Sequence, residues 1–169
     1  NVREIVDEVI KDKKLAVDEK GLRFFFKAED GDVSYMVRGD ITKMKQVVNN
    51  IVDNAIKYTS KGLIRVLLSK DEATNKVRIS VSDTGMGMDK ETIEHIFKMF
   101  NKQGGSSKET LPVSGIGLYV ARQIMKAHRG RIWAGSGGVG QGTTFFIEMN
   151  GATGIEEVNK DNIQQFKAI

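Results

Sequence analysis

The chain has 169 residues, of which 40% are hydrophobic and 28% charged, with a formal net charge of +4 and no cysteine. This is the profile of an ordinary globular domain with a hydrophobic core, and it excludes disulfides and thiolate metal sites. No apolar run reaches the roughly 18 residues that a membrane span needs, and basic residues alternate with acidic ones. We therefore expect a soluble, cytoplasmic domain that contacts neither nucleic acid nor a membrane, and this leaves open a membrane anchor elsewhere in a longer parent protein.

Hydrophobic periodicity and turn residues predict helices and strands in alternating groups. The first helix has apolar residues at helical spacing, and the strands alternate apolar with polar residues. In chain order the predicted elements are a helix over 2–20 ended by Gly21, a strand over 22–28, a turn over 29–32, a short extended piece over 35–39, a helix capped by Asp40 or Thr42 and running to about Thr59, a hairpin of strands 62–70 and 76–84, a short helix from Asp89 to Phe100, a polar loop over 101–115, a helix over 116–129, and strands over 130–136 and 142–149.

This order predicts an α+β fold, a two-layer α/β sandwich with helices on one face of a mixed, mostly antiparallel sheet. Residues 1–150 would form the domain, with 1–20 as a lead-in helix, and 151–169 a tail or linker. The run 135–140 matches G-x-G-x-x-G, but a β-rich segment follows it instead of the helix that a dinucleotide-binding motif requires. The chain also contains no P-loop motif.

The helix that ends near Thr59 has one apolar stripe and an opposite face with Gln46, Asn50, Asn54 and Lys57. Exposed helix faces usually carry Glu and Lys, which form helices better than Asn does. Amide oxygens are ligands suited to Mg²⁺, and a lysine one turn further can meet a phosphate. The spacing leaves two interpretations open, a binding face and a solvated face.

Glycine-rich motifs recur at three later points. Asp83 ends a strand and begins the run 83–87 with alternate glycines, 114–118 opens a helix after the polar loop, and 140–143 enters the last strand. Glycine allows a ligand to approach the backbone, and N–H groups at a helix N-terminus attract anions. Each motif alone is equally consistent with a tight turn, a hinge or a hairpin loop.

In this order, the motifs resemble the histidine-kinase ATPase domain, the Bergerat fold of the GHKL superfamily. NNIVDNAIKYT resembles the N box, DTGMG the G1 box, IFKMF the F box, SGIGL the G2 box and GQGTTF the G3 box. Arg38, Asp40, Lys43 and Gln46 resemble the lead-in to the N box. The resemblance covers residues 1–150.

The resemblance implies ATP and Mg²⁺ as cofactors and gives roles to particular residues. Asp83 would accept a hydrogen bond from the adenine amino group, and Asn54, helped by Asn50, would hold Mg²⁺. Residues 101–115 would form an ATP lid. The implied nucleotide-binding residues are Asn50, Asn54, Lys57, Tyr58, Asp83, Gly85, Gly87, Met88, Phe100, Lys102, Gly115, Ile116, Gly117, Leu118 and Thr143, and the implied catalytic residues are Asn50, Asn54, Lys57 and Lys102.

Relatives that hydrolyse ATP carry a glutamate one turn before the Mg²⁺-binding asparagine, where this chain has Asn50. Asp53 points about 100° away from Asn54 by helix geometry. The resemblance therefore implies transfer of the γ-phosphoryl group to a histidine on a separate dimerisation domain of the same kinase, with a response regulator as the further partner. Neither His95 nor His128 stands in an acceptor context. The alternatives are an ATP-hydrolysing module, an anti-sigma-type serine kinase and a non-enzymatic nucleotide sensor.

Overall fold

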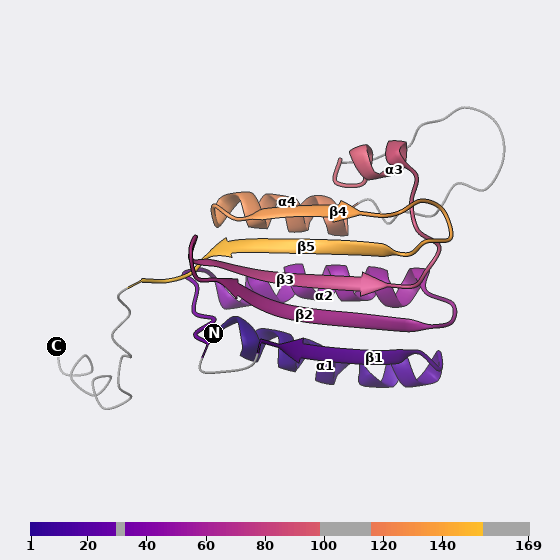
Figure 1. The fold of residues 1–169 in the computed structure, drawn as a ribbon, viewed down its shortest axis with the longest axis horizontal. Helices are drawn as coiled ribbons and strands as arrows, with labels where there is room; N and C mark the ends of the chain where they lie inside the picture. The colour runs from indigo at the N-terminus through magenta and orange to yellow at the C-terminus, as the bar shows by residue number, and fades with distance from the viewer. Residues whose placement is uncertain (30–32, 99–115, 154–169) are drawn as a thin grey trace.

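The chain forms two layers, a sheet and the helices that cover one of its faces (Figure 1). The computed structural model describes residues 1–29, 33–98 and 116–153. The elements are α1 (Val2–Glu19), β1 (Arg23–Ala28), α2 (Ile41–Tyr58), β2 (Leu63–Asp71), β3 (Lys76–Asp83), α3 (Lys90–His95), α4 (Gly117–Ala127), β4 (Arg131–Gly135) and β5 (Thr143–Asn150).

The sheet has five strands in the order β1-β2-β3-β5-β4. β1 pairs with β2 in parallel, and every other pair is antiparallel. The helices α1, α2 and α4 lie behind the sheet in Figure 1, and α3 lies near its upper edge. The predicted α+β class, with a mixed, mostly antiparallel sheet and helices on one face, is confirmed.

The core lies between α2 and the covered face of the sheet. The apolar stripe of α2 is fully buried, and in β3 the residues Val77, Ile79 and Val81 are buried at alternate positions. Both periodicities place apolar side chains toward the same layer, and burying that surface provides most of the stabilising free energy. α1 adds Val2, Val6 and Val9 along its inner side, in agreement with the spacing that predicted it.

The structure decides between two predicted helix caps, and two other local predictions differ from it. α2 begins after Asp40, whose carboxylate accepts from the Lys43 N–H, so Asp40 and not Thr42 is the cap. α3 ends at His95, well before Phe100, because a tight turn follows and Phe97 packs edge-to-face on Phe145 in the core. The extended piece over 35–39 makes only an isolated bridge, between Val37 and Gly151.

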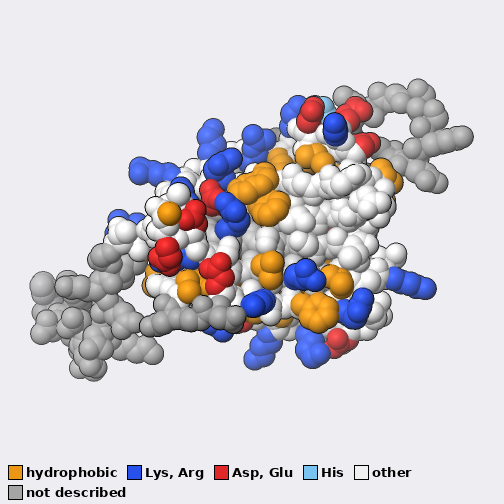
Figure 2. All heavy atoms as spheres, viewed as in Figure 1, with side chains coloured by type: hydrophobic (Ala, Val, Ile, Leu, Met, Phe, Trp, Pro, Cys, Tyr) orange, Lys and Arg blue, Asp and Glu red, His pale blue; other side chains and the backbone are white. Residues whose placement is uncertain are grey.

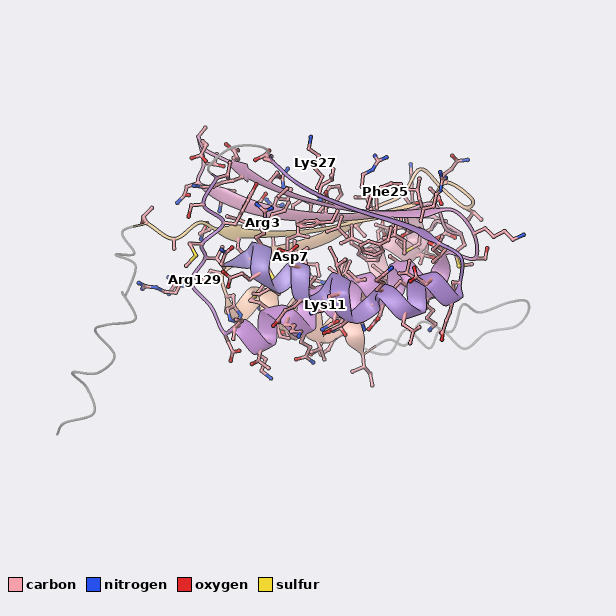
Figure 3. All side chains as sticks on the ribbon, turned by 90° about the horizontal axis from the view of Figure 1, so that it is seen from below. Arg3, Asp7, Lys11, Phe25, Lys27 and Arg129 are labelled. Atoms are coloured by element: carbon pink, nitrogen blue, oxygen red, sulfur yellow. The ribbon has the colours of Figure 1, made fainter. Side chains whose placement is uncertain are left out.

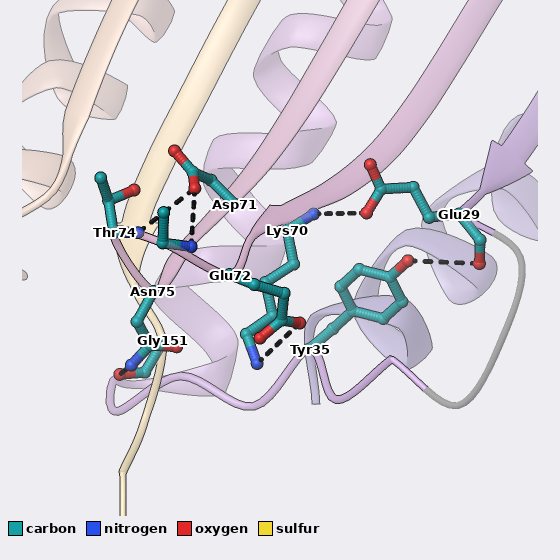
Figure 4. Close-up of polar contacts among 9 residues, drawn as sticks. Glu29, Tyr35, Lys70, Asp71, Glu72, Thr74, Asn75 and Gly151 are labelled. Carbon is teal, nitrogen blue, oxygen red and sulfur yellow. Dashed lines mark hydrogen bonds and ion pairs between the residues drawn. The ribbon is translucent and has the colours of Figure 1, made fainter.

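Polar contacts close the end of the sheet that is farther from α3 (Figure 4). The Asp71 carboxylate accepts from the backbone N–H groups of Ala73 and Thr74 and so shapes the turn between β2 and β3. The Asn75 side chain donates to the Gly151 carbonyl at 2.9 Å, which joins this turn to the residue after β5. Within the described ranges, none of the helices combines the length and the apolar character that crossing a membrane requires.

Candidate functional site

A pocket lies among α2, α3, the start of α4 and the ends of β3 and β5. Asn54 and Tyr58 enter it from α2, and Asp83 closes the end of β3. The remaining lining residues come from the segment after β3, from α3, from α4 and from β5: Met86, Gly87, Met88, Thr92, Ile96, Leu118, Thr143 and Phe145. Segments far apart in sequence therefore build one concave site that is mostly apolar, with a few polar groups.

Asp83 is the buried carboxylate of this pocket, only 9% exposed. Its Oδ1 accepts from the Gly85 N–H at 2.8 Å, and the Thr143 N–H also bonds to the carboxylate. Burial raises the pKa of Asp83, and the two backbone hydrogen bonds oppose that rise. The structure thus holds a strong hydrogen-bond acceptor in a fixed position inside an apolar pocket.

The backbone around Asp83 packs too closely for side chains. A Cβ at Gly85 would clash with the Tyr58 carbonyl oxygen and stand 2.8 Å from the Asp83 carboxylate. Gly87 has a φ of +66°, and a Cβ there would clash with the Gly138 carbonyl oxygen. These two glycines let the segment after β3 pass between α2 and the β4–β5 loop, so the wall of the pocket is backbone.

Ser136 joins that wall to the β4–β5 loop, and sequence reasoning missed it. Its Oγ accepts from the Met88 N–H at 3.1 Å and lies 2.6 Å from the Gly142 carbonyl oxygen, to which it donates. A serine between glycines indicates a turn. Its bond to Met88, which lies 48 positions away in sequence, has no local signal.

The polar face of α2 is partly covered by α4. The Asn50 side-chain amide donates to the Gly117 carbonyl at 2.9 Å, and Asn54 one turn later faces the pocket. Gln46 and Lys57 are exposed, and the Lys57 ammonium lies 5.0 Å from the centre of the Tyr58 ring. The two asparagines are thus half-buried at the site, whereas the two ends of the face meet solvent.

Asp53 points elsewhere. Its carboxylate lies 2.7 Å from the Lys13 ammonium on α1. This agrees with the rotation that helix geometry gives between Asp53 and Asn54. Apart from Asp83, no acidic side chain is among the described residues that line the pocket.

The structure brings together part of the predicted set. Gly85 lies next to two lining residues, against the Tyr58 carbonyl oxygen and the Asp83 carboxylate. Gly117 contacts Asn50, and Ile116 is 59% exposed at the start of α4. Phe100, Lys102, Gly115 and the rest of the predicted lid lie outside the described residues. The predicted residues that line the pocket are Asn54, Tyr58, Asp83, Gly87, Met88, Leu118 and Thr143.

Four lining residues were not predicted: Met86, Thr92, Ile96 and Phe145. Met86 stands inside the G1 motif, and its place between two glycines could have indicated it. Thr92, Ile96 and Phe145 carry no local signal, because a threonine on a short helix, an isoleucine and a strand phenylalanine are ordinary structural residues.

Both histidines make structural contacts. The His128 Nε2 accepts from the Asp40 N–H at 3.0 Å, and its Nδ1 donates to the Ile124 carbonyl at 2.8 Å, which together set the tautomer. His128 therefore ties the end of α4 to the start of α2. The His95 Nδ1 lies 2.7 Å from the Lys98 ammonium at the end of α3.

Residues 39–152 match the family described as histidine kinase-, DNA gyrase B-, and HSP90-like ATPase. The match covers more than half of the chain, from the residue before the α2 cap to just beyond β5. The chain belongs to this ATPase family. It is therefore an ATP-binding domain, and its likeness to individual proteins places it with the catalytic domains of sensor histidine kinases.

Sequence and structure comparisons agree on that placement. The adaptive-response sensory kinase SasA of Synechococcus elongatus is 41% identical over 111 residues, which cover 65% of this chain and 28% of SasA. The catalytic domain of the histidine kinase ThkA superposes with a TM-score of 0.72 at 28% identity, covering 89% of this chain and 92% of that one. ThkA in complex with the response regulator TrrA gives a TM-score of 0.72 at 29% identity over 90% of this chain and 41% of that one.

The ATPase domain spans under a third of the length of SasA. The ThkA catalytic domain, by contrast, is covered almost completely. The similarity therefore concerns the catalytic domain of these kinases.

Proposed function

We propose that this domain binds ATP with Mg²⁺ and transfers the γ-phosphoryl group to a histidine on a separate dimerisation domain of its parent kinase. A response regulator would then receive the phosphoryl group. The observation that carries the proposal is the buried Asp83 carboxylate in a backbone-walled pocket beside Asn54. Residues 1–150 would be the functional domain, since β5 ends at Asn150, and 151–169 a tail or linker.

The pocket suits an adenine ring. Asp83 offers an acceptor for an exocyclic amino group, and Met88, Ile96 and Leu118 offer apolar contact to the ring faces. A Cβ at Gly85 or Gly87 would fill space that the surrounding backbone already occupies, so both positions support this narrow wall. Thr143 and Tyr58 would complete the lining.

Asn54 and Asn50 supply amide oxygens toward the phosphate end, and Lys57 supplies a positive charge one turn from Asn54. Among residues 1–29, 33–98 and 116–153, no three His, Asp or Glu side chains gather into a metal site. The amide oxygens of Asn54 and Asn50 are few, and this fits Mg²⁺, which keeps water and phosphate oxygens as ligands when few protein ligands are present. Bound Mg²⁺ would supply neutralisation of the phosphate charge during transfer.

The site favours transfer over hydrolysis. A general base must lie within hydrogen-bond reach of the water that it activates. Asn50 stands one turn before Asn54 and has no basic carboxylate, and the Asp53 carboxylate is paired with Lys13 on α1. An acceptor imidazole needs no such base because it is itself a nucleophile. Positioning and charge neutralisation then provide the main catalytic contribution.

Radiolabelled ATP distinguishes transfer from hydrolysis. We expect the domain alone to bind ATP, release phosphate slowly and leave itself unlabelled. Adding the parent kinase's histidine-bearing dimerisation domain in trans should produce label on that domain, slowly because tethering is lost.

Rapid phosphate release by the domain alone would favour an ATP-hydrolysing module instead. Label on His95 or His128 would contradict the structural role of both histidines. The matched control is the dimerisation domain with its acceptor histidine replaced by alanine, which should remain unlabelled.

Asn54→Ala tests the Mg²⁺ assignment. We expect it to remove most of the Mg²⁺-dependent part of the ATP affinity, measured by calorimetry with and without Mg²⁺, and to leave the circular dichroism spectrum unchanged. The exposed Gln46→Ala on the same helix is the control and should retain the Mg²⁺ effect. An unfolded Asn54→Ala variant would make Asn54 a structural residue.

A further inference from the structure

The sheet face opposite the helices, here called the outer face, carries exposed basic side chains and large aromatic side chains that are exposed at Phe25 and half-buried at Trp133 and Phe146. Figure 3 shows Phe25 and Lys27 of β1 on this side, whereas Arg3, Asp7 and Lys11 of α1 lie on the helix side. Strand alternation and register put the following residues on the outer face: Arg23, Phe25, Lys27, Leu63, Arg65, Leu67, Ser69, Asp71, Lys76, Arg78, Ser80, Ser82, Arg131, Trp133, Gly135, Thr144, Phe146, Glu148 and Asn150.

One side of the outer face is an exposed apolar and basic edge. Phe25 is 48% exposed and Leu67 37% exposed, on neighbouring strands β1 and β2. Phe25 stands in register with Arg65, which is also exposed. Isolated apolar side chains on a surface are common, but aromatic and arginine side chains gathered together are typical of binding surfaces.

The other side is a rigid aromatic platform. Trp133 of β4 stacks on Phe146 of β5 with ring centres 5.1 Å apart. The guanidinium groups of Arg78 and Arg131 lie 5.6 and 5.3 Å from the Trp133 ring centre. These contacts hold the platform in place before any partner arrives, so little side-chain entropy remains to be lost on binding.

Small hydroxyl side chains separate the two sides. Ser82 and Thr144 are cross-strand partners with their hydroxyl oxygens 2.9 Å apart, and Ser80 faces Phe146. Figure 2 looks onto this face and shows hydrophobic side chains in separate groups, with uncharged polar surface between them. From β2 to β5 the sheet spans two strand spacings, about 10 Å, which is roughly the diameter of a helix.

The charge of the outer face is strongly positive. Its basic residues are Arg23, Lys27, Arg65, Lys76, Arg78 and Arg131. Glu148 is the acid at its centre, buried and bonded to Arg78 at 2.6 Å, and Asp71 at the strand end bonds to the backbone of its own turn. Glu148 is therefore not presented to a partner, whereas the Asp71 carboxylate is exposed at the edge of the face. The six basic residues outnumber these two acids, and the face as a whole attracts carboxylates.

We propose that the outer face is a docking surface for an amphipathic helix with acidic flanks, supplied by a partner protein. The helix axis would lie over the small side chains of Ser80 and Ser82, and apolar side chains of the helix would contact Leu67 on one side and Phe146 on the other. Its carboxylates would meet Arg65 on one side and Arg131 on the other. The helix would add a third layer to a fold that has only two. This site is separate from the nucleotide pocket, whose Asp83 and Thr143 face the helix layer.

Protein fits this face better than nucleic acid or membrane. Base stacking needs a free ring face, and Trp133 is already stacked on Phe146 with two guanidinium groups close to its ring. A membrane surface favours a continuous apolar rim, whereas the apolar groups here are separated by the hydroxyls of Ser80, Ser82 and Thr144.

The test uses nuclear magnetic resonance on the isotope-labelled chain with a synthetic helical peptide of about 20 residues, leucine on one side and glutamate on its flanks. We expect shifts in the outer-face signals of β2, β3 and β5 and in the Trp133 indole signal, with weaker binding at higher salt. Arg65→Glu should weaken binding about fivefold or more, and Lys11→Glu on α1, with the same change in charge, should not.

The same peptide with lysine in place of glutamate, phosphatidylserine vesicles and oligouridine RNA complete the experiment. The proposal is overturned if the acidic peptide fails to bind, if Arg65→Glu leaves its affinity unchanged, or if the vesicles or the RNA shift these signals at lower concentrations. ATP affinity of Arg65→Glu should equal that of the unmodified chain, which separates this surface from the proposed kinase function.

Discussion

Asp83 is an ionisable group that is buried, so we expect its replacement to affect ATP binding and the unfolding free energy differently. Asp83→Asn should weaken ATP binding by about 2 kcal/mol or more, the scale of a lost charged hydrogen bond. It should not lower the unfolding free energy of the ligand-free chain at pH 7, because burial disfavours the charged carboxylate and an asparagine oxygen can still accept from Gly85. Calorimetry and urea denaturation measure the two effects.

The pH dependence of stability follows from the same shift. The pKa of Asp83 is raised in the folded state, so between the ordinary value of 3.8 and the raised value the folded chain binds more protons than the unfolded one. The contribution of Asp83 to stability is therefore greatest below 3.8 and is lost as pH rises through the folded-state pKa. The advantage of Asp83→Asn in unfolding free energy should grow over that window, and a constant or shrinking difference would contradict it.

Alanine substitutions at Gly87 and Gly21 can distinguish the cost of backbone strain from the cost of steric clash. Both have φ near +60°, at +66° and +62°, but only Gly87 has backbone where a Cβ would stand. Gly21→Ala should cost about 1–2 kcal/mol of unfolding free energy and leave ATP affinity unchanged. Gly87→Ala should cost more and also weaken ATP binding, because the Gly138 carbonyl must move. Equal losses in urea denaturation would show that strain alone matters.

At the scale of elements, α4 ends in a conformation that favours glycine. Arg129 follows the His128 cap with a φ of +54°, and the Gly130 N–H bonds back to the Met125 carbonyl at 2.8 Å. Arg129→Gly should raise the unfolding free energy by about 1 kcal/mol because a non-glycine residue is strained there.

Arg122 in the middle of α4 is the matched control for this change. It is exposed, and Arg122→Gly should lower the unfolding free energy by about 1 kcal/mol, since glycine is a poor helix former. Both substitutions replace arginine by glycine, but their effects on the unfolding free energy should have opposite signs. The same sign in chemical denaturation would contradict the strain at Arg129.

At the scale of the whole molecule, the two sides of α2 contribute to different properties. Ile51 is fully buried against the sheet, whereas Ile41 on the same helix is 62% exposed. Ile51→Ala should lower the unfolding free energy by about 2–5 kcal/mol through lost burial and a cavity. Ile41→Ala should stay within about 0.5 kcal/mol.

ATP affinity of the folded fraction should be the same in both isoleucine variants, because neither side chain lines the pocket. ATP at a fixed saturating concentration should then raise the unfolding free energy of both variants by the same amount. A lower affinity in Ile51→Ala would indicate that the core positions Asn54 more directly than its contacts suggest.

The sequence by itself determined the elements, the fold class and the family motifs. Apolar spacing over α2 and alternation over β2 and β3 are local patterns, and local geometry alone turns them into a helix and a hairpin. The places of Asp83 and Asn54 at a candidate site could be predicted because an asparagine inside a helix and alternate glycines after a strand are costly without a purpose, and both residues line the same pocket. Their roles in binding come from the family resemblance and remain predictions.

Tertiary structure alone decided which segments meet. It placed β5 between β3 and β4, ended α3 at His95 so that Phe97 reaches Phe145, bonded Asn50 to Gly117, and brought Thr92 and Ser136 to the nucleotide pocket. It also left the outer face of the sheet open. These outcomes depend on packing between residues distant in the chain, and a short sequence pattern carries no information about such distant partners.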